Sequence, residues 1–191
     1  APGTEVTMEL TMRFDLGQAS QLLARTPPTL RALLAGVDDA WLDADEGEGT
    51  FSPAEVVGHL LEAERTNWLP RARVIRAGDP SAAFPPFDRY AHRRLHAGKR
   101  LEELLDEFAA LRHRNLAEVA SWGLDERALD ARAVHPEFGQ VTLRQLLSTW
   151  VVHGLGHLGQ VGRGMAKRSR EDVGPWERFL PILRGRPKPA S

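Results

Sequence analysis

The chain carries a long helical pattern, TLRQLLSTWVVHGLGHLGQVGRGMAK, at residues 142–167. Thr142 and Gln145 have the spacing of a capping box, so a helix is predicted to begin here and to run to about Lys167. One face of this helix combines apolar and polar residues at helical spacing, namely Leu143, Leu146, Trp150, His153, His157, Gln160 and Val161. This face is predicted to turn toward a core, where two histidines would lie among large apolar side chains.

Three further segments show helical spacing. The first runs from about Leu16 to Ala35 and contains Pro27 and Pro28, which lack N–H donors. These prolines are expected to break or kink the helix, with Thr26 capping the restart. The third of these segments, residues 99–121, has leucines, a phenylalanine and a valine at intervals of three and four.

The remaining segment has a well-marked start. Ser52 suits the N-cap, Pro53 the first helical position, and Glu55 completes a capping box. Its predicted apolar stripe consists of Val56, Leu60, Ala63, Asn67, Pro70 and Val74. Pro70 is expected to bend this helix.

The segments between the helices are predicted to be connections. Residues 78–87 form a proline-rich loop, residues 88–98 are polar and ambiguous, and residues 123–140 turn at 135–139. No segment longer than a few residues alternates as a strand does, so four long helices predict an all-α, four-helix bundle with long connections. A short C-terminal extension covers Trp176–Leu183. We expect one domain over residues 1–185 and a flexible basic tail over 186–191.

Composition narrows the function classes. The 191 residues are 42% hydrophobic and 27% charged, as in ordinary globular proteins. Cysteine is absent, which excludes a disulfide framework, a thiolate nucleophile and a Cys-based zinc site. A net charge of -1 argues against nucleic acid as a partner. No apolar run is long enough for a membrane span, and the first residues lack signal-peptide features, so a cytoplasmic protein is expected.

Two pairs among the seven histidines fall four residues apart. His92 and His96 flank two arginines that would repel a divalent cation, so a solvated surface is expected there. His153 and His157 lie on the apolar face described above, where two imidazoles can converge on one ion. The alternative is a pair of core histidines bonded to carbonyls or carboxylates.

A third candidate ligand is His59, which edges the apolar stripe of the helix that begins at Pro53. Metal sites in bundle cores draw ligands from facing helices, and three neutral imidazoles with an open position suit a catalytic zinc or a related ion. Gly154 follows His153 where a zincin protease would carry its general base, so that reaction is not indicated.

The chain resembles the DinB-like metalloprotein superfamily. The matching motifs are FSPAEVVGHLLEAE at residues 51–64 and VTLRQLLSTWVVHGLGHLGQ at residues 141–160, and the resemblance extends from about Leu23 to Leu183. It departs from the pattern at Gly154, where similar sequences often carry Asp.

This resemblance implies a four-helix bundle with up-down-down-up topology. It also implies one divalent metal ion, often nickel or zinc, held by His59, His153 and His157. Known family members include metal-dependent hydrolases and S-transferases that use bacillithiol or mycothiol, and many others have no assigned reaction.

Two polar residues are candidates for supporting roles. Gln160 lies three residues after His157 and could orient a ligand or a bound water, or it could be an amide bonded to backbone or solvent. Glu62 lies three residues after His59 and could accept its second N–H or act as a base, or it could be a solvated carboxylate. No residue is assigned as catalytic.

The predicted helix contains five glycines, at positions 154, 156, 159, 162 and 164. Each is expected to destabilise the helix by about 0.5–1 kcal/mol relative to alanine, so their presence requires an explanation. Gly156, Gly159 and Gly162 are predicted to point away from the histidines. Close approach of another helix would explain the missing side chains, and we expect a homodimer. The alternative is cover from the first helix or from Trp176–Leu183.

The leading hypothesis is an enzyme whose three-histidine metal centre activates water or a thiol. It would act on a small-molecule substrate, as a hydrolase or as an S-transferase using a low-molecular-weight thiol. The competing hypothesis is a non-catalytic binding or stress-response bundle with a structural metal.

Overall fold

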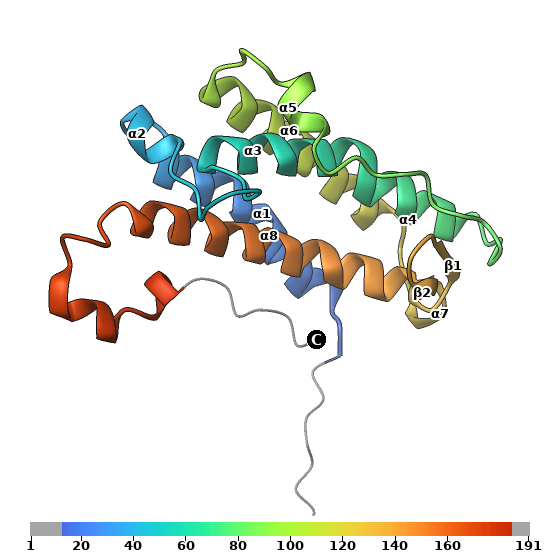
Figure 1. Cartoon of the computed structure of the whole chain (residues 1–191). Helices are drawn as coiled ribbons and strands as arrows, with labels where there is room; N and C mark the ends of the chain where they lie inside the picture. The colour runs from blue at the N-terminus through green and yellow to red at the C-terminus, as the bar shows by residue number, and fades with distance from the viewer. Residues whose placement is uncertain (1–12, 185–191) are drawn as a thin grey trace, which may run out of the picture.

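The computed structural model describes residues 13–184, which are mostly helical (Figure 1). The long helical segments are α1 (Leu16–Leu34), a continuous run of α3 (Pro53–Ala63), the π-helical turn η1 (Glu64–Trp68) and α4 (Leu69–Arg76), then α6 (Leu101–Ser121) and α8 (Leu143–Lys167). The predicted all-α four-helix bundle is confirmed. The predicted tail, residues 186–191, lies outside the described residues.

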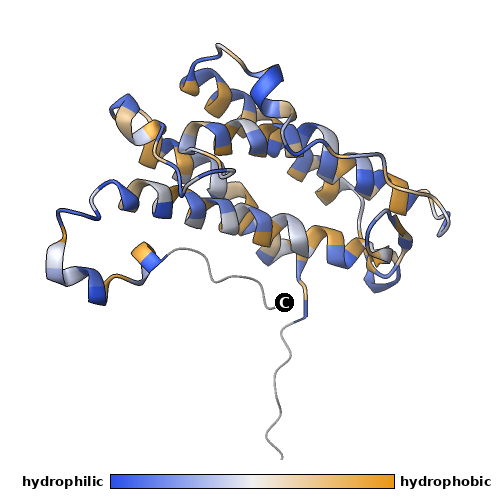
Figure 2. Ribbon diagram, viewed as in Figure 1, coloured by the Kyte–Doolittle hydropathy of each residue, from blue (hydrophilic) through white to orange (hydrophobic). Residues whose placement is uncertain are grey.

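Short elements join these helices. They are α2 (Asp39–Leu42), α5 (Ala91–Leu95), α7 (Glu126–Leu129), the strands β1 (Arg132–His135) and β2 (Gly139–Thr142), and the 3-10 turns η2 (Gly174–Phe179) and η3 (Pro181–Arg184). Hydrophobic and hydrophilic residues alternate around the long helices, as amphipathic helices require (Figure 2). No helix within residues 13–184 is long and apolar enough to cross a membrane.

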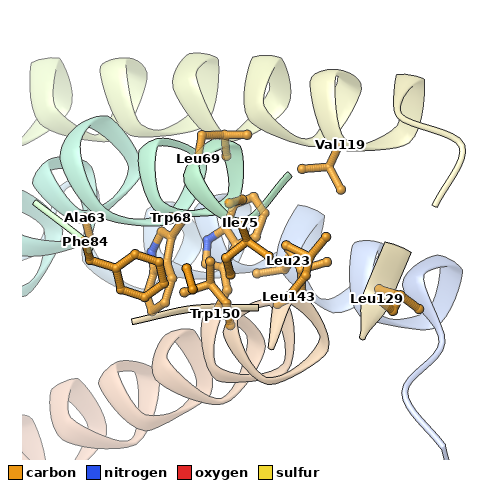
Figure 3. Close-up of a cluster of buried hydrophobic side chains, with 14 residues drawn as sticks. Leu23, Ala63, Trp68, Leu69, Ile75, Phe84, Val119, Leu129, Leu143 and Trp150 are labelled. Carbon is orange, nitrogen blue, oxygen red and sulfur yellow. The ribbon is translucent and has the colours of Figure 1, made fainter. Parts of the chain in front are cut away.

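The directions of the helices follow from two buried clusters. The hairpin-end core contains Leu23, Leu69, Ile75, Val119, Leu143 and Trp150, several of which Figure 3 shows. The α2-end core contains Leu34, Val56, Leu105 and Val161. Helices α1 and α8 therefore run from the hairpin end to the α2 end, whereas α3–α4 and α6 run the opposite way. This is the up-down-down-up order that the family resemblance implies.

This order requires a long return connection, because α4 and α6 run in the same direction. Residues 77–100 travel back along the bundle to the start of α6 (Figure 1). Strand β1 holds the start of this connection, since Phe84 N donates to Val134 O at 3.1 Å and Val134 N donates to Ala82 O at 2.8 Å. Farther along, α5 packs on α3, where His92 and His96 lie against Gly58.

Helix α1 corrects the prediction of a break and restart at Pro27 and Pro28, because it continues through both. A proline at position 27 leaves the carbonyl of Leu23 without its intrahelical donor. Arg112 NH1 donates to that carbonyl at 2.7 Å, so the missing bond is replaced from α6. Thr26 is buried and donates to Leu22 O at 3.3 Å rather than capping a second helix.

The second helical segment contains the π-helical turn η1, which ends two residues before Pro70. A π turn adds one residue to the helix, which rotates the face that follows it. Beyond η1 the buried apolar residues are therefore Leu69, Ala72 and Ile75, while the predicted Pro70 and Val74 are only half-buried.

The segment predicted as a connection at residues 123–140 contains a small antiparallel hairpin. Strands β1 and β2 pair from Arg132 opposite Thr142 to His135 opposite Gly139. Gly139 has a φ of 69°, which a side-chain-bearing residue rarely adopts. Strands of four residues are too short to show a convincing alternation in sequence.

A buried ion pair crosses the middle of the bundle. Glu64 Oε1 lies 2.7 Å from Arg112 NH2 and accepts from Trp150 Nε1 at 2.6 Å. Glu64 Oε2 accepts from Asn115 Nδ2 at 2.8 Å. Through Arg112 and Leu23 O the same network reaches α1, so it joins all four long helical segments.

We expect Glu64→Gln to destabilise the protein by about 3–5 kcal/mol, because it leaves the Arg112 charge buried without its carboxylate. Arg31→Ala, which removes one partner of the exposed pair Arg31–Asp106, should cost about 0–1 kcal/mol. Urea unfolding of the metal-free proteins measures both. Equal losses in the two variants would contradict a central role for Glu64.

Candidate metal centre

Three histidines from two helices meet in the structure. His59 lies on α3, and its Nε2 is 3.2 Å from His153 Nε2 on α8. His157 Nε2, one turn further along α8, is also 3.2 Å from His153 Nε2. The possible ligand atoms of the three residues lie within 4.8 Å of one another. The structure therefore brings together the histidines that the sequence singled out.

The far sides of two rings contact oxygen acceptors. His59 Nδ1 is 3.1 Å from the carbonyl oxygen of Arg89, and His157 Nδ1 is 3.0 Å from Gln160 Oε1. Gln160 Nε2 in turn donates to Phe51 O at 3.4 Å. These acceptors place the protons on Nδ1, so His59 and His157 present bare Nε2 lone pairs to the space they share.

His153 completes a set of donors suited to a cation. Its Nε2 faces two other Nε2 atoms, and a single imidazole N–H can serve only one acceptor. Its Nδ1 is buried and has no hydrogen-bond partner within residues 13–184, and its ring packs edge-on against Trp68 at 5.1 Å. At least one of the two His153 contacts therefore joins two nitrogens with no proton between them, an arrangement that a divalent metal ion would satisfy.

The surroundings favour the neutral form that binds metals. Burial, followed by the nearby His157, lowers the pKa of His59 to about 3. Burial and the same neighbour lower the pKa of His153 to about 2. Both imidazoles are therefore neutral near pH 7, and only neutral imidazole is a ligand.

A cavity of about 400 Å³ opens over the histidines. Its other lining residues are Gly49, Thr50, Phe51, Phe87, Arg89, Gly156 and Gln160. The guanidinium of Arg89 has no acidic partner within residues 13–184 and lies 5.0 Å from the ring of Tyr90. Gly156, predicted to point away from the histidines, instead lies on the cavity wall, where an added Cβ would meet nothing within 4 Å.

Glu62 does not contact the second nitrogen of His59, which faces the Arg89 carbonyl instead. It is not a solvated carboxylate either, because it is 2% exposed. Its Oε1 accepts from Arg65 at 2.7 Å and lies 3.0 Å from His96 Nε2. Glu62 thus supports the packing of α5 on α3.

The expected solvated surface at His92 and His96 is wrong. Both side chains are buried between α5 and α3, with exposed fractions of 3% and 7%. His92 packs edge-on against Phe51 at a centroid distance of 4.7 Å. Neither residue belongs to the group of converging ligands among the described residues.

Sequence reasoning did not identify the contributions of Arg89, Phe51 and Phe87. Arg89 acts on His59 through its backbone carbonyl, which no side-chain motif can indicate. Phe51 directly precedes the N-cap Ser52, and its carbonyl accepts from Gln160 while its ring lies 5.1 Å from that of His59. The signal that could have helped was the position of FSPAE immediately before the helix that carries His59.

Comparison with known proteins identifies the family and supports the fold. The family model of the DinB superfamily matches residues 22–161. The chain belongs to the DinB superfamily. The fold is similar to that of YfiT from Bacillus subtilis, described as a probable metal-dependent hydrolase with an unusual four-helix bundle topology. That match has a TM-score of 0.67 and 20% identity, and covers 91% of this chain and 93% of the other. No curated protein sequence matches the chain significantly.

We expect this DinB superfamily member to bind about one divalent ion per chain, because three neutral imidazoles converge. Replacing His59, His153 or His157 by Ala should abolish retention of the ion through dialysis. Gln160→Ala should weaken affinity by roughly 10–100-fold, because it frees the His157 ring. Elemental analysis of protein purified without a metal-affinity tag measures the ion content.

The matched controls are His92→Ala and His96→Ala, which remove buried histidines outside the converging group. Both should retain the ion. Equal metal content in His59→Ala and the parent protein would remove His59 from the ligand set.

Proposed function

We propose that this protein is a metal-dependent enzyme acting on small molecules, with one divalent ion, zinc or nickel, held by His59, His153 and His157. The observation that carries the proposal is the convergence of three Nε2 atoms beneath a cavity of about 400 Å³. A fourth His, Cys, Asp or Glu ligand does not join this group within residues 13–184. Three protein ligands with one position left for solvent or substrate are typical of catalytic sites.

The protein's own groups define how a substrate would bind. The chemistry that a divalent ion supplies in such a site is Lewis-acid activation of a water or a thiol near neutral pH. Phe51 and Phe87 provide apolar walls, and Gly156 leaves room above the histidines. Arg89 is exposed and has no acidic partner in the described part of the chain, which favours a substrate that carries a carboxylate or another anionic group.

Hydrolysis and thiol transfer both fit this arrangement. The chain has no cysteine, so a thiol must arrive as a substrate, and a low-molecular-weight thiol with carboxylate groups would suit Arg89. A non-catalytic bundle with a structural metal remains the competing function, but a structural ion usually has four protein ligands. A cytoplasmic location stays a prediction from the sequence.

We expect turnover to vanish on chelation and to return with zinc, nickel or manganese. The assay offers the metal-loaded protein low-molecular-weight thiols with a chlorinated arene, and separately a panel of esters and amides, each in anionic and neutral forms. Turnover that survives complete metal removal would exclude the proposed mechanism. Absence of turnover with every substrate, together with four protein ligands on the ion, would favour the structural role.

Two substitutions at Gly156 distinguish the cavity from the metal site within the same experiment. Gly156→Ala should raise stability by about 0.5–1 kcal/mol and keep both metal and turnover, because the added methyl meets nothing. Gly156→Phe should keep the metal but fill the cavity, lowering kcat/KM at least about tenfold, equivalent to 1.4 kcal/mol. Full activity in Gly156→Phe would place the reaction outside this cavity.

We also propose that the protein forms a homodimer through the outer face of α8. Part of that face is covered within the chain, since Gly162 faces Ile182 of η3. Val152 and Leu155 stay 65% and 46% exposed. A second copy is the most common partner for such a face.

Sedimentation should therefore show a species of twice 21.2 kDa at micromolar concentration. Val152→Asp should shift it to the monomer, because the new charge would be buried in the interface. Leu95→Asp is the matched control, since it adds a charge at an exposed apolar residue of α5, on another helix. A monomer in the parent protein would exclude the dimer.

A further inference from the structure

A second, smaller cavity lies between the η1–α4 segment, the β1–β2 hairpin and the start of α8. Its volume is about 130 Å³, and it shares no lining residue with the metal cavity. Trp68 forms one wall, and the ring of Trp68 also packs against His153. We call this space the Arg71 cavity, after the charged residue that lines it together with Asn67, Trp68, Phe84, His135 and Phe138.

Buried polar atoms without partners gather at this cavity. Asn67 Oδ1, Trp68 Nε1 and Arg71 Nε have no hydrogen-bond partner within residues 13–184. Their residues are only 6%, 4% and 9% exposed. Because an unpaired buried polar group costs free energy, three of them around one space indicate that a polar ligand fits there.

Arg71 is the strongest of these signals. It has no carboxylate partner in the described part of the chain, and its NH2 group makes only a long contact of 3.4 Å to Pro85 O. Its guanidinium lies 5.0 Å from the ring of Phe84, and burial lowers its pKa. Arg112, the other buried arginine, has Glu64 at 2.7 Å, so this protein pairs a buried guanidinium with a carboxylate where the chain supplies one.

His135 adds a donor to the rim. Its Nδ1 accepts from the backbone N–H groups of Glu137 at 3.1 Å and Phe138 at 3.4 Å, which puts the imidazole proton on Nε2. The ring of Phe138 stacks on that of His135 at 4.4 Å and is 73% exposed, so it stands between the cavity and solvent. The cavity thus combines N–H donors with aromatic walls and has no acidic residue in its lining.

We propose that the Arg71 cavity is a binding site for a small organic carboxylate. The guanidinium Nε–H and the Trp68 indole N–H are buried donors for its oxygens, and Phe84 and Phe138 contact its apolar part. Rotation of the Asn67 amide would turn its NH2 group toward the ligand. This rotation breaks no hydrogen bond of Oδ1, because Oδ1 has no partner within residues 13–184. A volume of about 130 Å³ corresponds to about four waters at roughly 30 Å³ each, which matches a ligand the size of propionate.

The test uses the full-length, metal-free protein, so that a carboxylate cannot bind to an ion at the histidines. Sodium propionate, at constant ionic strength against sodium chloride, should raise Tm in a saturable manner, and the neutral isostere propionamide should not. Arg71→Met should weaken propionate binding by roughly 10–100-fold, as expected for loss of a charged hydrogen-bond donor. Arg73→Met is the matched control, because Arg73 lies on the same helix but is exposed and pairs with Glu118; it should bind as the parent does.

A second measurement covers the case in which Arg71→Met does not fold. The chain has five tryptophans, and propionate should shift the indole N–H resonance of Trp68, assigned by Trp68→Phe, more than the others. Arg71→Lys, which keeps the charge, should bind more weakly but still saturate. Equal responses to propionate and propionamide, equal loss in Arg73→Met, tighter binding of inorganic phosphate, or no saturable response in the parent protein would each overturn the proposal.

Discussion

The carboxylate of Glu64 is the contact on which the arrangement of the helices depends. It lies in the π-helical turn η1 and binds Arg112 and Asn115 of α6 and Trp150 of α8. Since a charge without its partners is costly in a core, these contacts fix how far α3 and α8 can slide past each other. Glu64 follows His59 by five residues and Trp150 precedes His153 by three, so the same contacts set the axial position at which the histidines meet. This ion pair therefore helps to set the geometry of the candidate metal centre.

The order of the helices also determines which residues surround the histidines. Because α4 and α6 run in the same direction, residues 77–100 must return along the bundle, and this connection passes beside His59. It supplies the Arg89 carbonyl that orients the His59 ring, and Phe87 as a cavity wall. An up-down-up-down bundle with short loops would leave that side of His59 open. The topology therefore requires this connection, and the connection also contributes residues to the site.

Local sequence signals made the helix starts and the three histidines predictable. Features that depend on residues far apart in the sequence could not be predicted. The capping boxes at Ser52 and Thr142 are complete within three residues and are present in the structure. The continuity of α1 through Pro27 could not be predicted, because Arg112 serves the Leu23 carbonyl from 89 positions away. In the same way, the burial of His96 depends on Glu62 of another helix. The burial of Glu64 depends on Arg112 of α6, whose position relative to η1 a sequence pattern does not give. A sequence pattern shows which residues share the face of one helix. The burial of these residues depends on contacts between two helices, which such a pattern does not show.

The glycines of α8 show how this helix gives up intrinsic stability for access and close approach. Gly154 lies against Thr26 of α1, where an added Cβ would stand 3.4 Å from the hydroxyl oxygen. Gly164 faces the backbone oxygen of Ala44, which an added Cβ would approach to 2.6 Å, so no larger residue fits without movement of that segment. Gly156 has open space instead, and that space is the cavity above the histidines. Packing does not exclude a small side chain at Gly156, but a large one would fill the cavity that the proposed chemistry needs, which links this position of α8 to that chemistry.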